Sequence, residues 1–315
     1  MQVCDTRADK AKTVKQNSIF DLASCAMCPR RCGVDRTRGE RGVCGEGYEM
    51  RVSRISLHPY EEPVISGSGG AGTVFFCGCP MGCAYCQNKD ISRGECEGEI
   101  FSPKQLADAM LSLQKRSAEC IDLVTPTHFS HGVAEALRLV KDKLEIPVVY
   151  NTSGYERVET LQQLEGLVDV YMPDFKYASA EIASRYSSAP DYSEVACAAL
   201  AEMYRQVGKY EYSETGMLKR GVLIRHLVLP SCRKDSIEVL RLIAQAVPVG
   251  DVLLSLMSQY TPDFALDAPY EELHRRITRF EYDSVLRAAE QYGFDGFVQY
   301  LSSASAKYTP DFKGK

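Results

Sequence analysis

From residue 73 onward, short apolar runs alternate with longer amphipathic segments. The runs are rich in β-branched residues and cover 73–76, 121–124, 146–150, 167–171, 222–229 and 252–257. Runs of this length and composition predict strands that are buried on both faces. The segments between them predict helices near 102–113, 130–140, 156–164, 192–206, 236–246 and 282–292. Six strands alternating with helices predict an α/β fold, a parallel sheet curled into a partial (β/α)6 barrel.

The chain before residue 72 has a different character. It is rich in glycine, arginine and cysteine and shows little hydrophobic periodicity, which is typical of a small metal-stabilised module. We therefore expect three parts: an N-terminal cysteine-rich metal-binding module with a linker in 1–70, the barrel in 71–300 and a tail in 301–315. The polar segment 187–221 is expected to be an insertion before the fifth strand, either a cap over the substrate or a solvated helical excursion.

Composition and charge narrow the function classes. The net charge of −5 provides no basic field for nucleic acid or an anionic membrane. No segment approaches the roughly 20 apolar residues of a membrane span, and the first 18 residues contain no apolar signal core. These features predict a cytoplasmic protein. In that reducing compartment, the clustered members of its 13 cysteines are expected to bind metal rather than form disulfides.

Nearly every predicted strand is followed by a polar motif. In chain order the motifs read CGCPMGC, TPTH, NTSGY, PDFK, LPS and SQYTP. In (β/α) barrels the active site is built at the carboxyl ends of the strands, so a barrel would gather these motifs into one cup. This pattern favours a barrel over a flat sheet.

The first motif has the strongest chemical signature. Cys79, Cys83 and Cys86 follow the first strand with the spacing C-x3-C-x2-C on a glycine-containing loop. Three thiolates so spaced can hold three corners of a 4Fe-4S cluster, and the fourth iron then lacks a protein ligand. The alternative is a zinc site in which Cys77 supplies a fourth thiolate. We favour the cluster and interpret Cys77 as a buried thiol at the end of the strand.

The segment from Phe76 to Asn88, FCGCPMGCAYCQN, resembles the cluster loop of radical S-adenosylmethionine (SAM) enzymes. It is most similar to that of the pyruvate formate-lyase activating enzymes and their uncharacterised relatives, and the upstream segment EEPVISG (61–67) resembles the relatives. The resemblance covers most of the chain. It implies a radical SAM barrel in which SAM occupies the open iron, is cleaved by an electron from the cluster, and yields a 5′-deoxyadenosyl radical that abstracts hydrogen.

The resemblance also implies contacts to SAM. Tyr85 matches the aromatic position beside the adenine, and Asn88 matches a position near the adenosine. Asp174 and Lys176 match a fourth-strand M-x-D-x-K pattern in which both residues contact SAM, although a local surface ion pair is the alternative. The remaining implied positions are Asn151 on the third strand, Arg225 or His226 on the fifth, and Gln259 with Tyr260 on the sixth. Since side chains alternate along a strand, only one of Arg225 and His226 can face the barrel interior.

Two strand ends depart from the family pattern. The second strand ends in TPTH instead of a Gly-Gly-Glu type motif, so Thr125, Thr127 and His128 would receive the SAM amino group. His128 is equally well interpreted as a half-buried structural histidine. Asn151 stands where the activating enzymes carry an aspartate at a monovalent-cation site, which removes a charge from that site.

A second group of cysteines lies near the N-terminus. Cys25, Cys28, Cys32 and Cys44 have the spacing C-x2-C-x3-C-x11-C, and four thiolates close a metal site without a vacancy. The site predicts either a second 4Fe-4S cluster that relays electrons to the first or a structural zinc ion. The context of a redox enzyme favours the iron-sulfur cluster.

These features predict a radical SAM enzyme, an oxidoreductase of the activating-enzyme kind. The resemblance implies an electron donor such as flavodoxin or ferredoxin. Two substrates are open: a glycine Cα–H on a partner glycyl-radical enzyme, and a small molecule or another peptide. The alternative from a different class is a non-catalytic interaction protein with two zinc sites.

Overall fold

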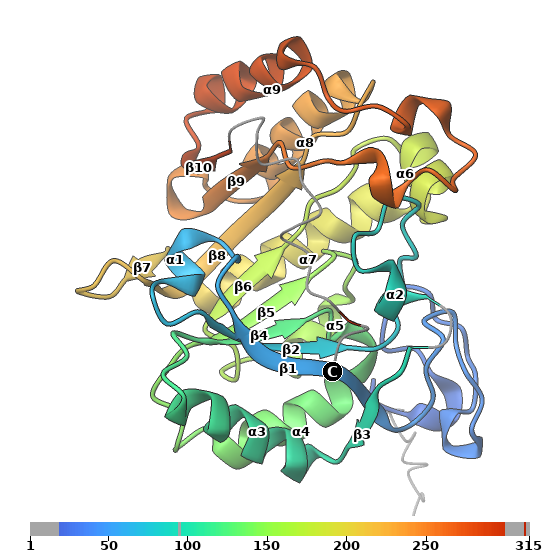
Figure 1. The fold of residues 1–315 in the computed structure, drawn as a ribbon, viewed down its shortest axis with the longest axis vertical. Coiled ribbons are helices and arrows are strands. Elements are labelled where there is room, and N and C mark those ends of the chain that lie inside the picture. Colours follow the sequence, from blue (N-terminus) through green and yellow to red (C-terminus); the bar gives the residue numbers. More distant parts are fainter. Residues whose placement is uncertain (1–18, 94–95, 300–311, 313–315) are drawn as a thin grey trace, which may run out of the picture.

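The computed structural model describes residues 19–93, 96–299 and 312. Within these ranges a ten-stranded sheet runs through the molecule in the order β10-β9-β8-β6-β5-β4-β2-β1-β3, with β7 paired to β8 (Figure 1). The strands are β1 Met50–His58, β2 Ala71–Phe76, β3 Glu99–Phe101, β4 Ile121–Val124, β5 Val148–Thr152, β6 Val170–Pro173, β7 Glu211–Tyr212, β8 Leu218–Leu227, β9 Leu253–Met257 and β10 Asp295–Val298.

The six strands predicted from the apolar runs are β2, β4, β5, β6, β8 and β9, and neighbours among them pair in parallel. Every residue of β2, β4, β5, β6 and β9 is buried, which confirms the expectation of strands covered on both faces. Within the described residues, β3 and β10 are the edges of the sheet and do not pair with each other. The predicted α/β fold with a partial barrel is therefore confirmed.

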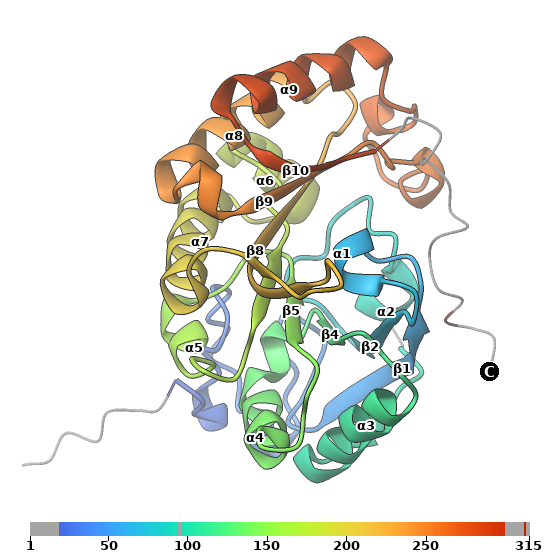
Figure 2. The same ribbon diagram turned by 90° about the vertical axis from the view of Figure 1, so that its left-hand side faces the viewer.

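The predicted helices form the outer layer. Figure 2 shows α3, α4, α5, α7, α8 and α9 along the convex side of the curved sheet. Helix α3 begins as expected, because Ser102 caps it in a capping box and Pro103 occupies the first helical position. No helix of the described ranges has both the length and the apolar character that crossing a bilayer requires. The helices are α1 Pro63–Ser66, α2 Lys89–Ser92, α3 Pro103–Lys115, α4 Ser130–Val140, α5 Val158–Gln162, α6 Ala180–Ser187, α7 Tyr192–Val207, α8 Arg233–Ala246 and α9 Arg279–Tyr292, and six short 3-10 helices cover Leu22–Ser24, Arg36–Arg38, Thr127–Phe129, Val249–Asp251, Pro262–Phe264 and Glu271–Leu273.

The segment 187–221 is neither a cap nor a solvated excursion, so that expectation was wrong. Most of it is α7, which connects β6 to β8 and packs on both strands. Its buried face includes Tyr192, Ala199, Leu200 and Met203. Glu194 and Arg205 lie on its exposed side, and the short strand β7 is exposed as well.

Strands β1 and β10 were not predicted. β1 pairs antiparallel with β2 from Val52 opposite Phe76 to His58 opposite Ala71, so the sheet continues across the division expected at residue 70. β10 adds a parallel strand next to β9. Most residues of both strands are partly or fully exposed, and therefore neither strand forms a continuous apolar run.

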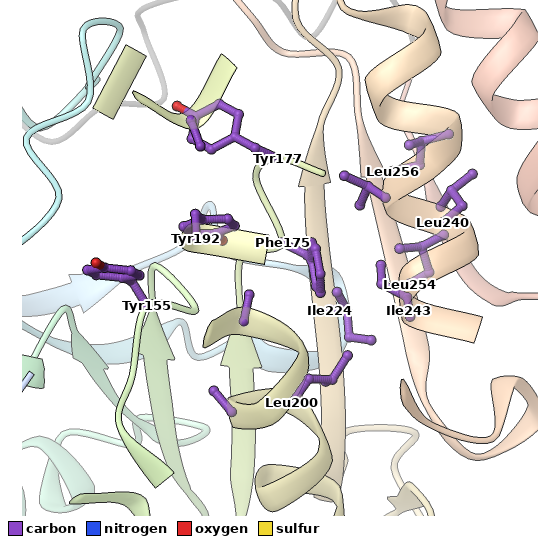
Figure 3. Close-up of a cluster of buried hydrophobic side chains, with 14 of the residues drawn as sticks. Tyr155, Phe175, Tyr177, Tyr192, Leu200, Ile224, Leu240, Ile243, Leu254 and Leu256 are labelled. Carbon is purple, nitrogen blue, oxygen red and sulfur yellow. The ribbon is translucent and has the colours of Figure 1, made fainter. Parts of the chain in front are cut away.

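The main core lies between the sheet and the outer helices. Figure 3 shows Leu200 of α7 and Ile243 of α8 packed toward Ile224 of β8 and Leu254 of β9. Toward the carboxyl ends of the strands this core becomes aromatic, with Phe175, Tyr177, Tyr192 and Tyr155 in contact around the loops that follow β5 and β6.

Candidate active site

A cavity of about 520 Å³ opens at the carboxyl ends of the parallel strands. It lies where a (β/α) barrel places its active site. Eleven residues predicted from the sequence as metal or SAM ligands, together with Tyr260, are among those that line it: Cys79, Cys83, Tyr85, Cys86, Asn88, Thr125, Asn151, Asp174, Lys176, Arg225, Gln259 and Tyr260. The structure therefore brings most of the predicted site residues together around one cavity.

The loop that carries Cys79, Cys83 and Cys86 is held by two hydrogen bonds at its start. The Gly78 N–H donates to the Ile91 carbonyl (2.8 Å), and the Cys79 N–H donates to the Cys44 carbonyl (3.2 Å). Gly78 has a φ of 79°, and a Cβ there would lie 2.6 Å from the Cys44 carbonyl oxygen, so both backbone conformation and space require glycine. The loop is thereby fixed between α2 and the N-terminal module.

Each of the three thiols has polar neighbours in the chain. The Met81 N–H donates to Cys79 Sγ (3.4 Å), the Ser187 hydroxyl donates to Cys83 Sγ (3.1 Å), and the Ser92 hydroxyl lies 3.3 Å from Cys86 Sγ. Burial, and then the neighbouring cysteine sulfurs, raise the pKa of the Cys79 thiol to about 12. Thiolates at this position therefore need a positive charge beside them, which bound metal would supply.

The spacing of the thiols bears on which metal group they fit. In the part of the chain that the structure describes, no three Cys, His, Asp or Glu side chains converge on the position of a single metal ion. A zinc ion draws four donors to about 2.0–2.3 Å from one point. Each iron of a cluster takes its own thiolate, so the ligands surround a larger group. Cys79, Cys83 and Cys86 provide three thiols at one cavity, the number that leaves one iron of a 4Fe-4S cluster without a protein ligand.

Arg225 is the centre of a buried polar network beside the thiols. Its Nε donates to Asp174 Oδ1 (2.9 Å), its Nη2 to Asn151 Oδ1 (2.7 Å), and its Nη1 lies 3.3 Å from Glu61 Oε2. Lys176 Nζ lies 2.6 Å from Asp174 Oδ2. Burial opposes ionisation of Asp174, but the Arg225 and Lys176 cations outweigh it and hold the pKa of that carboxyl below its usual value. Because both cations are largely buried, the alternative of a solvated surface pair is wrong.

Two acidic residues near this network, Glu61 and Glu62, were not predicted as part of the site. Glu61 and Glu62, which precede α1, line the cavity, and Glu62 accepts a hydrogen bond from Ser255 of β9 (2.7 Å). Desolvation raises the pKa of Glu62. In the sequence these residues were recognised only as part of a segment that resembles the family, since carboxylates upstream of the first predicted strand carry no signal that they will line the barrel cavity.

Three predicted SAM contacts do not line the cavity. After β4 the chain enters the 3-10 helix Thr127–Phe129, which turns Thr127 toward the Glu156 carboxylate and His128 toward the Cys77 carbonyl (Nε2 to O 2.6 Å). Thr125, with a φ of 51°, remains at the cavity. On β8, Arg225 faces inward and His226 faces the Phe175 carbonyl (Nδ1 to O 2.6 Å). Burial lowers the pKa of His128 to about 3 and of His226 to about 4, so both rings are neutral.

Two buried polar atoms in cavity-lining residues have no partner among the described residues. They are Asn88 Oδ1 and Ser153 Oγ. Buried polar atoms are nearly always hydrogen-bonded, so unpaired atoms in a cavity wall indicate where a bound molecule supplies the partner. A polar ligand such as SAM, with Tyr85 as an apolar neighbour in the same wall, fits this arrangement.

The N-terminal cysteines lie directly beside the cluster loop. Cys25, Cys28 and Cys44 are buried and Cys32 is half-buried, and all four are free thiols. The buried guanidinium of Arg36 donates from Nη1 to the His128 carbonyl (2.7 Å) and lies 3.9 Å from Cys25 Sγ. The structure therefore brings the two predicted metal-binding groups together.

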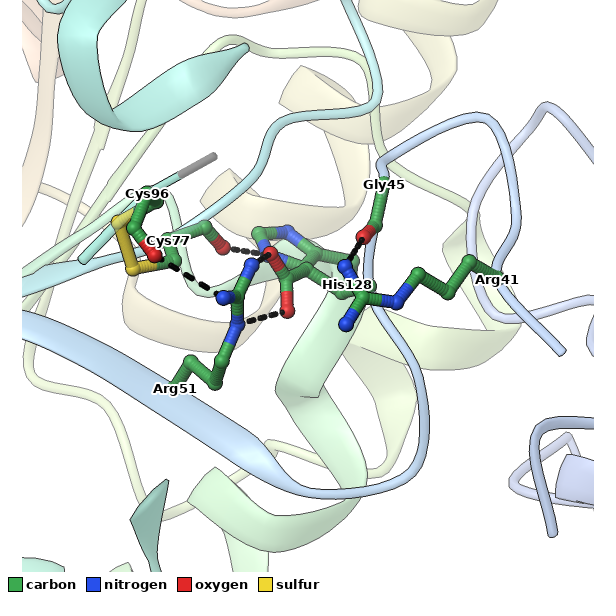
Figure 4. Close-up of a disulfide and its surroundings, with 7 residues drawn as sticks. Arg41, Gly45, Arg51, Cys77, Cys96 and His128 are labelled. Carbon is green, nitrogen blue, oxygen red and sulfur yellow. Dashed lines mark hydrogen bonds and ion pairs between the residues drawn. A yellow bond between two sulfur atoms is a disulfide. The ribbon is translucent and has the colours of Figure 1, made fainter. Parts of the chain in front are cut away.

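Cys77 is not a free thiol, which corrects the sequence interpretation. It forms a disulfide with Cys96, and both residues are buried (Figure 4). Arg51 holds the Cys96 carbonyl (2.9 Å) and pairs with Glu46 (2.6 Å). Because its sulfur is bonded to Cys96, Cys77 is unable to act as the fourth thiolate of a zinc site.

Comparison with known proteins agrees with this geometry. Residues 73–218 match the family model described as Radical SAM superfamily. An uncharacterized protein of Methanocaldococcus jannaschii is 29% identical in an alignment of 303 positions that covers 92% of this chain and 79% of that protein. A radical SAM methyltransferase from Sphaerobacter thermophilus has a similar structure, with a TM-score of 0.50 and 14% identity over 73% of this chain and 66% of that one. At this identity the structural likeness supports the fold alone.

Proposed function

We propose, on the basis of the match of residues 73–218 to the radical SAM family model, that the chain is an enzyme that cleaves SAM reductively and abstracts hydrogen from a substrate. Cys79, Cys83 and Cys86 would hold a 4Fe-4S cluster, with one iron left for SAM. When bound, the cluster and SAM supply an electron and a 5′-deoxyadenosyl radical. The observation that carries the proposal is that three thiols and the polar strand ends line one cavity.

The chain's own residues bind and orient SAM in this proposal. Lys176 supplies an ammonium for the SAM carboxylate, and Asp174, held by Arg225, keeps that ammonium in place. Tyr85 packs beside the adenine. Asn88 Oδ1 accepts a hydrogen bond from the ligand, and Ser153 Oγ accepts or donates one, since both atoms lack a partner among the described residues. Thr125, Asn151 and Gln259 complete the polar wall.

Two substrate classes follow. The resemblance to activating enzymes favours a glycine Cα–H on a partner glycyl-radical enzyme. The presence of Glu61 in the cavity wall favours instead a small molecule or peptide that carries an amino group, for which this side chain offers a hydrogen-bond acceptor.

The N-terminal cysteines are proposed to hold a second metal centre. Cys25, Cys28, Cys32 and Cys44 are free, and their module is hydrogen-bonded to the cluster loop through Cys44. A second 4Fe-4S cluster there would relay electrons from a donor such as flavodoxin or ferredoxin. Zinc at the same four thiols would serve folding alone.

The test starts from anaerobically reconstituted protein. We expect iron and sulfide to load, and dithionite with SAM to produce 5′-deoxyadenosine. Cys83→Ala should abolish that product, whereas Cys120→Ala, which removes a buried free cysteine away from the cavity, should not. A colourless, zinc-loaded protein that does not cleave SAM would overturn the proposal and leave the interaction-protein alternative.

The substrate classes are separated by electron paramagnetic resonance. Protein that cleaves SAM is incubated with a candidate glycyl-radical enzyme, and a glycyl radical signal supports the first class. Absence of that signal, together with 5′-deoxyadenosine formation that depends on an added amine and is weakened by Glu61→Gln, supports the second class.

The iron content of a Cys25/Cys28 double alanine variant shows whether the N-terminal centre holds iron or zinc.

A further inference from the structure

A chain of three hydroxyl groups connects the cavity wall to the sulfur of Cys83. The Tyr85 and Tyr177 hydroxyls are 2.7 Å apart, the Tyr177 hydroxyl is 2.7 Å from Ser187 Oγ, and the Ser187 hydroxyl donates to Cys83 Sγ over 3.1 Å. All four residues are buried. Tyr85 comes from the cluster loop, Tyr177 from the loop after β6 and Ser187 from the end of α6.

The number of protons fixes the direction of this chain. Each hydroxyl carries one proton, and a thiolate carries none, so a Cys83 thiolate requires that Ser187 donates to it. Ser187 then has no second proton and must accept from Tyr177. Tyr177 in turn must accept from Tyr85. All three hydrogen bonds therefore point toward the sulfur, an arrangement in which each bond polarises and strengthens the next.

Resting on the proposed function, we propose that Tyr85, Tyr177 and Ser187 form a hydrogen-bond relay that raises the reduction potential of the cluster held by Cys83. A donor to a cluster sulfur stabilises negative charge, and the reduced cluster carries one more negative charge than the oxidised one. The relay therefore favours the reduced state. These are positioning residues, because Ser187 acts on the thiolate and the tyrosines act through Ser187.

The surroundings make the relay specific to Cys83. Met81 N–H is the polar neighbour of Cys79, and Ser92 is that of Cys86, so neither sulfur receives a donor with a buried hydroxyl chain behind it. The rings of Tyr85 and Tyr177 meet edge to face with centroids 6.5 Å apart, and packing therefore holds them in place without the hydroxyls. Tyr→Phe variants remove only the proton donors.

The experiment is a redox titration of the reconstituted protein without SAM, followed by electron paramagnetic resonance. We expect Ser187→Ala to lower the midpoint potential most, Tyr177→Phe less and Tyr85→Phe least, because each step is one bond further from the sulfur. For Ser187→Ala the ratio of reduced to oxidised cluster at fixed potential should fall about tenfold, which is about 59 mV for a one-electron couple. SAM is absent, so the role of Tyr85 in the cavity does not enter the measurement.

Tyr155→Phe is the matched control. Its ring belongs to the same tyrosine cluster and stacks on Tyr192, but its hydroxyl donates to Asp191 and is not part of the relay. We expect an unchanged potential. Unchanged potentials in Ser187→Ala and Tyr177→Phe, or an equal shift in Tyr155→Phe, would overturn the relay. Iron and sulfide analysis of the wild type comes first: failure to load a cluster contradicts the proposed function, whereas a loaded cluster with unshifted variants contradicts the relay alone.

Discussion

Removal of the Cys77–Cys96 disulfide should destabilise the metal-free protein by an amount that depends on the number of residues between the two cysteines. The two cysteines are 19 residues apart, and the segment between them contains the entire cluster loop and α2. In the chain-entropy account, a cross-link of this length restricts the unfolded chain by about 11 cal/mol/K, or about 3 kcal/mol at 25 °C. We therefore expect Cys77→Ala/Cys96→Ala to lower the free energy of unfolding by about 3 kcal/mol.

Urea unfolding of metal-free protein, with and without reductant, measures this effect. Reductant should shift the wild type by the same amount as the double substitution and should leave the double variant unchanged. Thiol titration of the unfolded wild type should show two further thiols after reduction. Cys197→Ser, which alters a half-buried free cysteine, is the control and should stay within about 0.5 kcal/mol of the wild type. The entropic reasoning would be refuted if the thiol titration shows the disulfide but reductant does not change the unfolding of the wild type.

Further predictions concern the cavity, pH and the cluster loop. Lys176→Met should weaken equilibrium binding of SAM about tenfold or more because a charge-assisted hydrogen bond is lost, while Lys209→Met, which removes an exposed surface pair, should not. Burial raises the pKa of Glu156 from 4.5 to about 7, so the folded state keeps its proton to higher pH than the unfolded chain. The free energy of unfolding should therefore fall as pH rises through this window, and Glu156→Gln should remove that part of the dependence in urea titrations. Gly78→Ala should reduce iron loading because it clashes with the backbone of the N-terminal module, whereas Gly216→Ala, at a positive φ in open space, should affect only the β7 turn.

The sequence predicted those parts of the fold that are buried on both faces. β4 and β9 are short, apolar and bounded by polar motifs, and such a pattern has one structural interpretation. β1 was not predicted because most of its side chains are partly exposed, so apolar and polar residues alternate only weakly along it. α7 was predicted as a helix but misjudged as solvated, since its buried face includes Tyr192 and Glu202, whose polar groups weaken the apolar pattern.

The candidate site shows a similar division. Asp174, directly after β6, lines the cavity as the resemblance implied, whereas strand alternation left open whether Arg225 or His226 faces inward, and the structure places Arg225 there. Thr127 and His128 lie further along, where the chain turns into a 3-10 helix that no periodicity indicated. Glu61 was not recognised as part of the site because its contact with Arg225 joins residues far apart in the sequence.

Residues that precede β2 contribute to the candidate active site. The family match begins at residue 73, yet several groups that hold the cluster loop come from earlier residues. Cys44 accepts a hydrogen bond from the Cys79 N–H, and the buried Arg36 holds the His128 carbonyl. His128 is neutral, so its Nε2 must carry the proton that it donates to the Cys77 carbonyl, which makes it a structural histidine at the base of the loop. Because Arg36 and Cys44 precede β1, the barrel strands from β2 onward would lack these hydrogen bonds at the start of the cluster loop.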